Sequence, residues 1–145
     1  MIRCQLVTLD GVKFDEEVYE VLLPTLDGDI GVLTDHMPLI SVAKTGIISI
    51  RRKAGDPDDF MEQYVTYGGV IEVADNVLRV LVDEADHSDE VNEQEAQRAY
   101  ELAQKMKTEA KDQVSLDHAQ SLMDRQAVRL KVADMRRRRG SRPRG

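Results

Sequence analysis

Residues 24 to 41, PTLDGDIGVLTDHMPLIS, combine the side-chain types that metal sites and acid/base sites use. Asp27, Asp29 and Asp35 supply carboxylates and His36 supplies an imidazole, within a short, glycine-containing span. One hypothesis is therefore a small hydrolase that works through Asp29 and His36, which predicts turnover by the isolated protein and a perturbed histidine titration. The other is that these residues form the turns of a β-rich domain.

Metal binding is not supported by the spacing of these residues. A calcium loop starting at Asp27 would need glycine at its sixth position, where the chain has Val32, and no glutamate closes the loop. For zinc, His36 has no histidine partner at a typical spacing, because His87 and His118 lie far along the chain. No nucleophile motif, phosphate loop or dinucleotide fingerprint is present either. The sequence predicts no catalytic residue, no metal and no cofactor.

The composition of the 145 residues allows one main core, because 41% of them are hydrophobic. Cys4 is the single cysteine, so the chain can form no internal disulfide, which is typical of a reducing compartment. The chain carries no signal-peptide pattern and no run long enough to span a membrane, and we expect a soluble, cytoplasmic protein. The net charge of -7 divides unevenly: residues 1–86 carry -10 and residues 87–145 carry +3.

The first part of the chain has the pattern of a β-sandwich or barrel. Short apolar and β-branched runs alternate with turn signals up to about residue 86. The turn signals are Asp10-Gly11, Asp27-Gly28, the stretch KAGDPDD and Asp75-Asn76. Glycine and asparagine tolerate the positive φ that tight turns need. We therefore predict a sheet domain over residues 1–86.

The remainder has a helical period. A stripe of small and apolar residues recurs at steps of three and four: Ala96, Ala99, Ala103, Met106 and Ala110. A second stripe follows: Leu116, Ala119, Met123, Ala127, Leu130 and Ala133. Asn92 and Ser115 are the expected N-caps, and the short connection predicts an antiparallel hairpin over residues 87–135. Because the seam is mostly alanine and buries little apolar area, one interpretation is a hairpin that can open. The alternative is that alanine only allows the two helices to pack closely.

The last ten residues, 136–145, are rich in arginine, and we predict a disordered basic tail. The tail supports an alternative function, in which a free-standing β-domain binds nucleic acid. It has no interleaved aromatic residues for base stacking and no recognisable reading module, so we expect no specific nucleic-acid partner.

The stretch GDIGVLTDHMPLIS resembles the most recognisable motif of the ε subunit of the bacterial F-type ATP synthase, which is homologous to the mitochondrial δ subunit. It matches through the residues Gly28, Asp29, Gly31, His36, Pro38, Leu39 and Ser41. Asp35 departs from the glycine that is usual at its position. A second motif, GGVIEVADNVLRVLVDEA, matches as well, and the resemblance continues through RLKVADM over nearly the whole chain.

The resemblance implies a ten-stranded β-sandwich followed by a two-helix hairpin, in a non-catalytic subunit of the central stalk that rotates with the membrane ring. Its expected partners are the γ subunit, the ring of c subunits and, when the hairpin extends, the catalytic α and β subunits. The expected c-ring contacts are Asp27, Asp29 and Ile30. The expected γ contacts are His36, Met37, Leu39 and Ser41. Such a subunit lies at the cytoplasmic face of the plasma membrane without inserting into it.

The resemblance also implies a role for the hairpin. In the family the helices can extend alongside γ and restrain ATP hydrolysis, which assigns the contacts with the β subunits to basic residues: Arg125, Arg129, Lys131, Arg136 and Arg137. Some members bind ATP through a motif at the start of the first helix. Here Asn92 and Glu95 replace its aspartate and arginine, which disfavours ATP binding. Glu95 and Arg98 nearly restore the motif one turn later, so ATP binding stays an alternative with Asn92, Glu95 and Arg98 as its candidate contacts.

Overall fold

The computed structural model describes residues 1–141, which fall into two compact units. The first unit is Met1–His87 and the second begins at Ser88. The strands of the first unit are β1 (Ile2–Thr8), β2 (Gly11–Val18), β3 (Glu20–Thr25), β4 (Gly28–Leu33), β5 (Leu39–Arg51), β6 (Glu62–Ala74), β7 (Val77–Leu81) and β8 (Ala85–His87). The 3₁₀ turn η1 (Asp58–Phe60) precedes β6, and η2 (Ser88–Glu90) opens the second unit.

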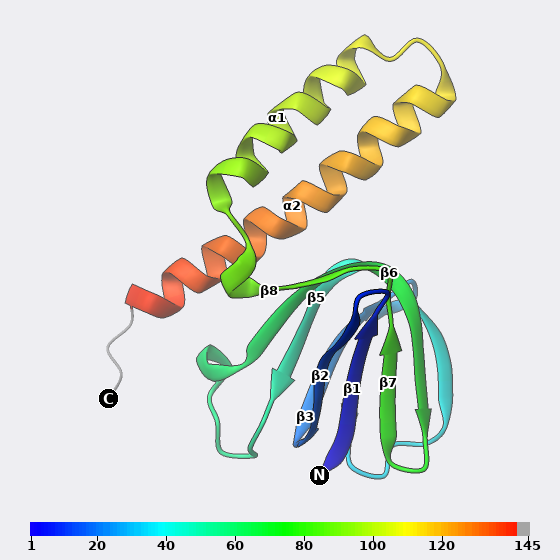
Figure 1. Ribbon diagram of the computed structural model, residues 1–145, viewed down its shortest axis with the longest axis vertical. Coiled ribbons are helices and arrows are strands. Elements are labelled where there is room, and N and C mark those ends of the chain that lie inside the picture. The colour runs from blue at the N-terminus through cyan, green and yellow to red at the C-terminus, as the bar shows by residue number, and fades with distance from the viewer. Residues whose placement is uncertain (142–145) are drawn as a thin grey trace. The chain divides into compact units, whose positions relative to one another are not determined.

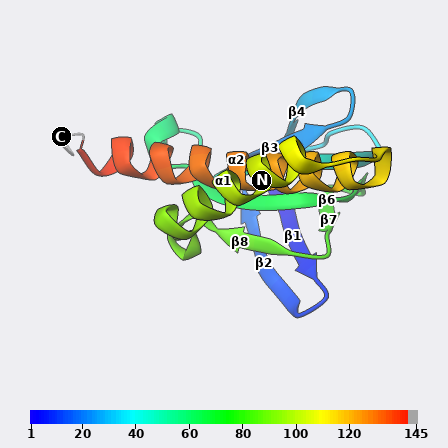
Figure 2. The same ribbon diagram turned by 90° about the horizontal axis from the view of Figure 1, so that it is seen from above.

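The strands form one mixed sheet in the order β2-β1-β7-β6-β5-β3-β4, with β8 paired to β6. β1 and β7 run parallel, whereas the other printed pairs are antiparallel. Figure 1 shows β5 and β6 curving strongly over the top of this sheet. The two ends of the strand order, β2 and β4, lie on opposite sides of the unit in Figure 2. The curvature encloses a core between the inner faces of the sheet.

The core consists of residues that alternate along the strands. In β1, Ile2, Cys4 and Leu6 are buried and their neighbours are more exposed, which is the period of two expected for a sheet with one covered face. The largest fully buried side chains of this core are Ile2, Leu6, Leu23, Ile48, Ile50, Ile71 and Leu78. All members of the cluster belong to residues 1–87, so the first unit has a hydrophobic core of its own.

The number of strands differs from the expectation of ten, because the described residues contain eight. β5 and β6 are each 13 residues long, and each runs through a bend at which a shorter strand would have ended. Their ladder pairs Ala43 with Gly69 and resumes at Thr45 with Tyr67, so the strands bend there without ending. Gly68 and Gly69 have φ of 106° and 152°, values that L-residues with a side chain rarely adopt. Glycine thus bends β6 instead of terminating it.

The predicted turns are confirmed. Gly11 and Gly28 have φ of 125° and 119° at the start of β2 and β4. Asp75 and Asn76 both have positive φ, 50° and 61°, and form the two-residue connection between β6 and β7. This is the conformation of a type I′ hairpin turn, whose twist matches that of the strands. Asp35 also has positive φ, 56°, which explains why glycine suits its position in the family motif.

The second unit is the predicted helical hairpin, made of α1 (Glu93–Glu109) and α2 (Gln113–Ser141), which run side by side in Figure 1. Asn92 caps α1 as expected, since its side chain accepts a hydrogen bond of 3.0 Å from the Glu95 N–H. The expected cap of the second helix was wrong. The Asp112 carboxylate accepts the N–H of Ser115 at 2.7 Å, so Asp112 takes the capping position and Ser115 lies within the first turn.

The alanine seam is present but incomplete. Ala96, Ala103, Ala119 and Ala133 are buried, as the stripes predicted, whereas Ala127 is exposed. Small side chains allow close helix packing but bury little apolar area, at about 0.8 kcal/mol per methylene.

The tail differs from the expectation of disorder. Residues 136–141 continue α2, consistent with the good helix propensity of arginine and with the absence of proline from residues 113–141. Residues 142–145 of the expected tail lie outside the described residues.

The Cys4 thiol gives the sheet unit a measurable dependence on high pH. Burial, with a smaller contribution from Asp15, raises the pKa of Cys4 from its ordinary value of 9.0 to about 12. Between these values the unfolded chain releases the thiol proton and the folded chain does not, so stability falls as pH rises above about 9. Urea unfolding at pH 8 and 10.5 should show an extra loss of about 2 kcal/mol relative to Cys4→Ala. Equal losses in the two proteins would contradict this prediction.

Candidate functional site

The β3–β4 hairpin presents two carboxylates to solvent. Asp27 and Asp29 are exposed on either side of Gly28, and the turn is fixed by Thr25, whose hydroxyl accepts the Asp27 N–H at 3.2 Å and donates to the Gly28 carbonyl. Ile30 differs from these two residues, because it packs against the core. The hairpin is thus a rigid turn with an acidic tip.

The loop between β4 and β5 positions His36 and Met37. The Asp35 N–H donates to the Asn76 side-chain oxygen at 2.8 Å, which ties this loop to the β6–β7 turn. His36 Nδ1 lies 2.7 Å from the Met37 carbonyl, so that nitrogen carries the proton and donates it. Met37 projects outward with 73% of its surface exposed. Among the residues described, no group of three or more metal-ligating side chains comes together.

β5 places its first residues on opposite faces. Leu39 packs against the core, and Ser41 follows two residues later on the same face and is half-buried. Ile40 and Val42 lie on the outer face with exposed fractions of 79% and 51%. Leu39 and Ser41 are the expected γ contacts of this strand, whereas the side chains that face solvent are those of Ile40 and Val42, which the resemblance did not name. The period of two along a strand could have indicated them, because a buried Leu39 requires an outward Ile40.

The outer face carries an apolar row across five strands. Each member is the ladder partner of the next, from β5 through β6, β7 and β1 to β2: Val42, Val70, Leu81, Val7 and Val12. Val42, Val70, Leu81 and Val12 are exposed by 51%, 44%, 45% and 63%. Isolated exposed apolar residues are ordinary, but a contiguous row of them on one face is typical of a protein interface.

A polar row lies beside the apolar one and ends at Ile40. Its members are again ladder partners: Ile40, Glu72, Arg79, Gln5 and Asp15. Arg79 donates to the Gln5 side chain at 3.2 Å and lies 3.9 Å from the Glu72 carboxylate. At the Ile40 end a groove of about 390 Å³ opens between β5 and β6, lined by Pro38, Leu39, Ile40, Glu72, Val73 and Ala74. The two rows and the groove form one surface with an apolar centre and a polar border, the usual composition of an interface.

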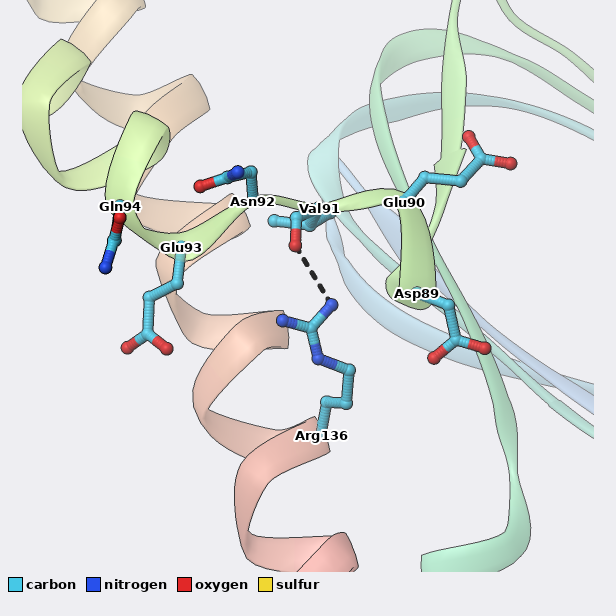
Figure 3. A pocket seen from close by; sticks show the side chains of 7 residues that line it. All are labelled: Asp89, Glu90, Val91, Asn92, Glu93, Gln94 and Arg136. Atoms are coloured by element: carbon cyan, nitrogen blue, oxygen red, sulfur yellow. Dashed lines mark hydrogen bonds between the residues drawn. The ribbon is translucent and has the colours of Figure 1, made fainter.

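The second unit contains a pocket of about 640 Å³ at the start of α1, shown in Figure 3. Its lining includes three carboxylates and one guanidinium: Asp89, Glu90, Glu93 and Arg136, together with Val91, Asn92 and Gln94. Of the three candidate ATP contacts, Asn92 lines the pocket, and its side-chain oxygen is used by the helix cap. Glu95 and Arg98 are exposed elsewhere on α1. A polyphosphate would meet more negative than positive charge here.

The basic residues of α2 lie in different surroundings. Arg125 and Arg129 are half-buried, and Lys131 is exposed. Arg136 donates to backbone carbonyls, and Arg137 forms ion pairs with Glu93 at 3.3 Å and with Asp134 at 2.7 Å. Arg136 and Arg137 are therefore engaged within the second unit.

None of the helices in residues 1–141 has the length and apolar character needed to cross a bilayer.

These features define a class of protein: a β-sandwich with an apolar row on its outer face, followed by a helical hairpin. The family model described as "ATP synthase, Delta/Epsilon chain, beta-sandwich domain" matches residues 1–88. An ATP synthase epsilon chain from Herpetosiphon aurantiacus is 32% identical over 139 residues, covering 95% of this chain and 98% of its own. One from Synechocystis is 33% identical over 103 residues, covering 71% and 72%. The chain belongs to the ATP synthase delta/epsilon family and is a non-catalytic subunit, as predicted.

Solved structures agree on the fold. A chain of the mitochondrial ATP synthase from Euglena gracilis superposes with a TM-score of 0.78 at 23% identity, covering 91% of this chain and 80% of its own. A chain from the central stalk and c-ring structure of the Tetrahymena thermophila enzyme gives 0.63 at 15% identity, covering 89% and 93%. At these identities the likeness concerns the fold alone. It covers both the β-sandwich and most of the helical residues.

Proposed function

We propose that this subunit couples γ to the c-ring in the central stalk of a proton-driven ATP synthase, at the cytoplasmic face of the plasma membrane. The observation that carries the proposal is the apolar row on the outer face of the sheet, together with the groove at the Ile40 end of the neighbouring polar row. An exposed apolar face of this kind needs a partner, and γ is the partner that the family membership suggests. We place the γ contact on His36, Met37, Ile40 and Val42, with Leu39 and Ser41 supporting it from the inner face of β5.

The acidic tip of the β3–β4 hairpin suits a second, polar partner. Asp27 and Asp29 are exposed and held by a rigid turn, so they can accept hydrogen bonds from the polar loops of a c-ring. Ile30 packs against the hydrophobic core and thereby anchors the hairpin that carries the two aspartates. The acidic tip and the apolar row have different chemistry, which supports docking to two different subunits.

We further propose that the hairpin restrains ATP hydrolysis when it extends toward the catalytic α and β subunits, through Arg125, Arg129, Lys131, Arg136 and Arg137. An exposed ion pair contributes only about 0 to 1 kcal/mol, so the restraint would need several of these residues together. We propose no role for bound ATP, because carboxylates dominate the pocket at the start of α1.

The experiment that tests this function measures ATP hydrolysis by the matching catalytic core, depleted of this subunit, after adding back either the full chain or residues 1–88. The shorter chain keeps the whole core of the sheet unit, so it should fold and bind γ. We expect both chains to bind and only the full chain to lower turnover. Failure of both chains to bind would refute the docking proposal, and equal turnover with both bound would refute the restraint by the hairpin.

A further inference from the structure

Arg136 connects the end of α2 to the segment that leads into α1. Its Nη1 donates to the carbonyl oxygen of Ser88 at 2.5 Å and to that of Val91 at 2.9 Å; the bond to Val91 is drawn in Figure 3. Ser88 and Val91 are 1% and 3% exposed. Buried backbone carbonyls need a hydrogen-bond donor, and a charged donor forms a stronger bond than a neutral one.

The Ser88 side chain does not add a polar tie to this segment. The Ser88 hydroxyl is buried and has no hydrogen-bond partner within the described part of the chain. η2 is a single short turn, and its end is held by a long backbone bond of 3.4 Å from the Val91 N–H to the Ser88 carbonyl. The Arg136 guanidinium is therefore a major polar tie between this segment and α2.

The next residue, Arg137, adds a second contact at this end of the hairpin. Arg137 lies 3.3 Å from Glu93, the first residue of α1. Arg138 makes a different contact, an ion pair of 3.0 Å with Asp134 on its own helix. Two consecutive arginines thus reach across the hairpin at its open end, opposite the connection between the helices. At that end the chain itself does not hold the helices together.

We propose that Arg136 is a latch that keeps the open end of the hairpin closed. The alanine seam gives the two helices a weak apolar attraction, so the bonds of one guanidinium to two buried carbonyls are a large share of what holds the end of α2 in place. Opening the hairpin must break both bonds and expose the two carbonyls to water. The link from this latch to the restraint of hydrolysis rests on the function proposed above; the latch itself is a property of the isolated chain.

The test is amide hydrogen exchange on the full-length isolated chain. Arg136→Gln removes the charge and the forked donor, and residues 91–96 and 132–139 should then exchange at least about tenfold faster. Arg138→Gln is the matched control, because it makes the same charge change two residues later and leaves the contacts to Ser88 and Val91 in place. Arg136→Lys, which retains a charged donor, should give an intermediate rate.

Equal exchange in Arg136→Gln and Arg138→Gln would overturn the latch. Circular dichroism at the same temperature checks that each variant keeps its helix content. If Arg136→Gln loses α2 altogether while Arg138→Gln keeps it, the dependence of α2 on the Arg136 side chain is stronger still. No other subunit is present in this experiment. Its failure is therefore distinct from failure of the hydrolysis experiment, which tests the function in the assembled core.

Discussion

Replacement of Ile40 and Val42 together by aspartate is expected to weaken binding to γ at least about 100-fold while the fold is retained. Both side chains point outward from β5, so the charges remain solvated in the free protein. In a complex over the apolar row they would be buried without a partner, which costs several kcal/mol for a charged group. Titration calorimetry with γ, alone or in the depleted core, measures the change.

A matched control is Phe60→Asp. Phe60 is an exposed apolar residue, 54% accessible, in η1 and outside the two rows, so its replacement should leave the affinity for γ unchanged. The melting curves of both variants establish that they are folded. Wild-type affinity in the folded double variant would show that γ docks elsewhere on the molecule.

Gly69→Ala is expected to destabilise the sheet unit by about 3 kcal/mol, a large fraction of the stability of a small domain. Gly69 has φ of 152°, and a Cβ built there would lie 2.6 Å from Val82 Cγ1 and in collision with the Leu81 carbonyl oxygen. The Leu81 carbonyl oxygen is a backbone atom of β7, and the Val82 Cα, directly after β7, lies 3.1 Å away, so relief requires movement of the backbone. Urea unfolding at neutral pH gives the free energy directly.

Gly55→Ala provides the comparison for this substitution. Gly55 lies in the loop after β5, and a Cβ there would meet nothing within 4 Å. Its free energy of unfolding should change by no more than about 0.5 kcal/mol. A Gly69→Ala variant as stable as Gly55→Ala would mean that the sheet can relax at this bend.

The features that sequence predicted well are those with a local physical cause. Asp75-Asn76 forms the tight turn that these two residues favour, and Asn92 caps a helix through an N–H only three residues away. The position of the second cap was missed by a few residues because Asp112 and Ser115 can both accept such a bond. The family motif suggested residues 28–41 as a docking region, which stays a prediction, and it did not show that Ile40 and Val42 face outward while Leu39 packs against the core.

The features that sequence did not predict depend on contacts between distant residues. β5 and β6 continue through their bends because they pair with each other along nearly their whole length. A short-range sequence pattern does not reveal this pairing. The end of α2 is held by Arg136, whose partners Ser88 and Val91 lie far back in the chain. A run of arginines with no visible partner in the sequence was interpreted as a tail, although two of them reach the start of α1.

The parallel pairing of β1 with β7 has a consequence for biosynthesis. β2 follows β1 at once and can form a ribbon with it as the nascent chain leaves the ribosome, but β7 (Val77–Leu81) is made only after β6. Until then the other edge of β1 has no partner, and an open strand edge tends to pair with other copies. β2 carries Asp15, Glu16 and Glu17, whose like charges oppose such association between nascent chains.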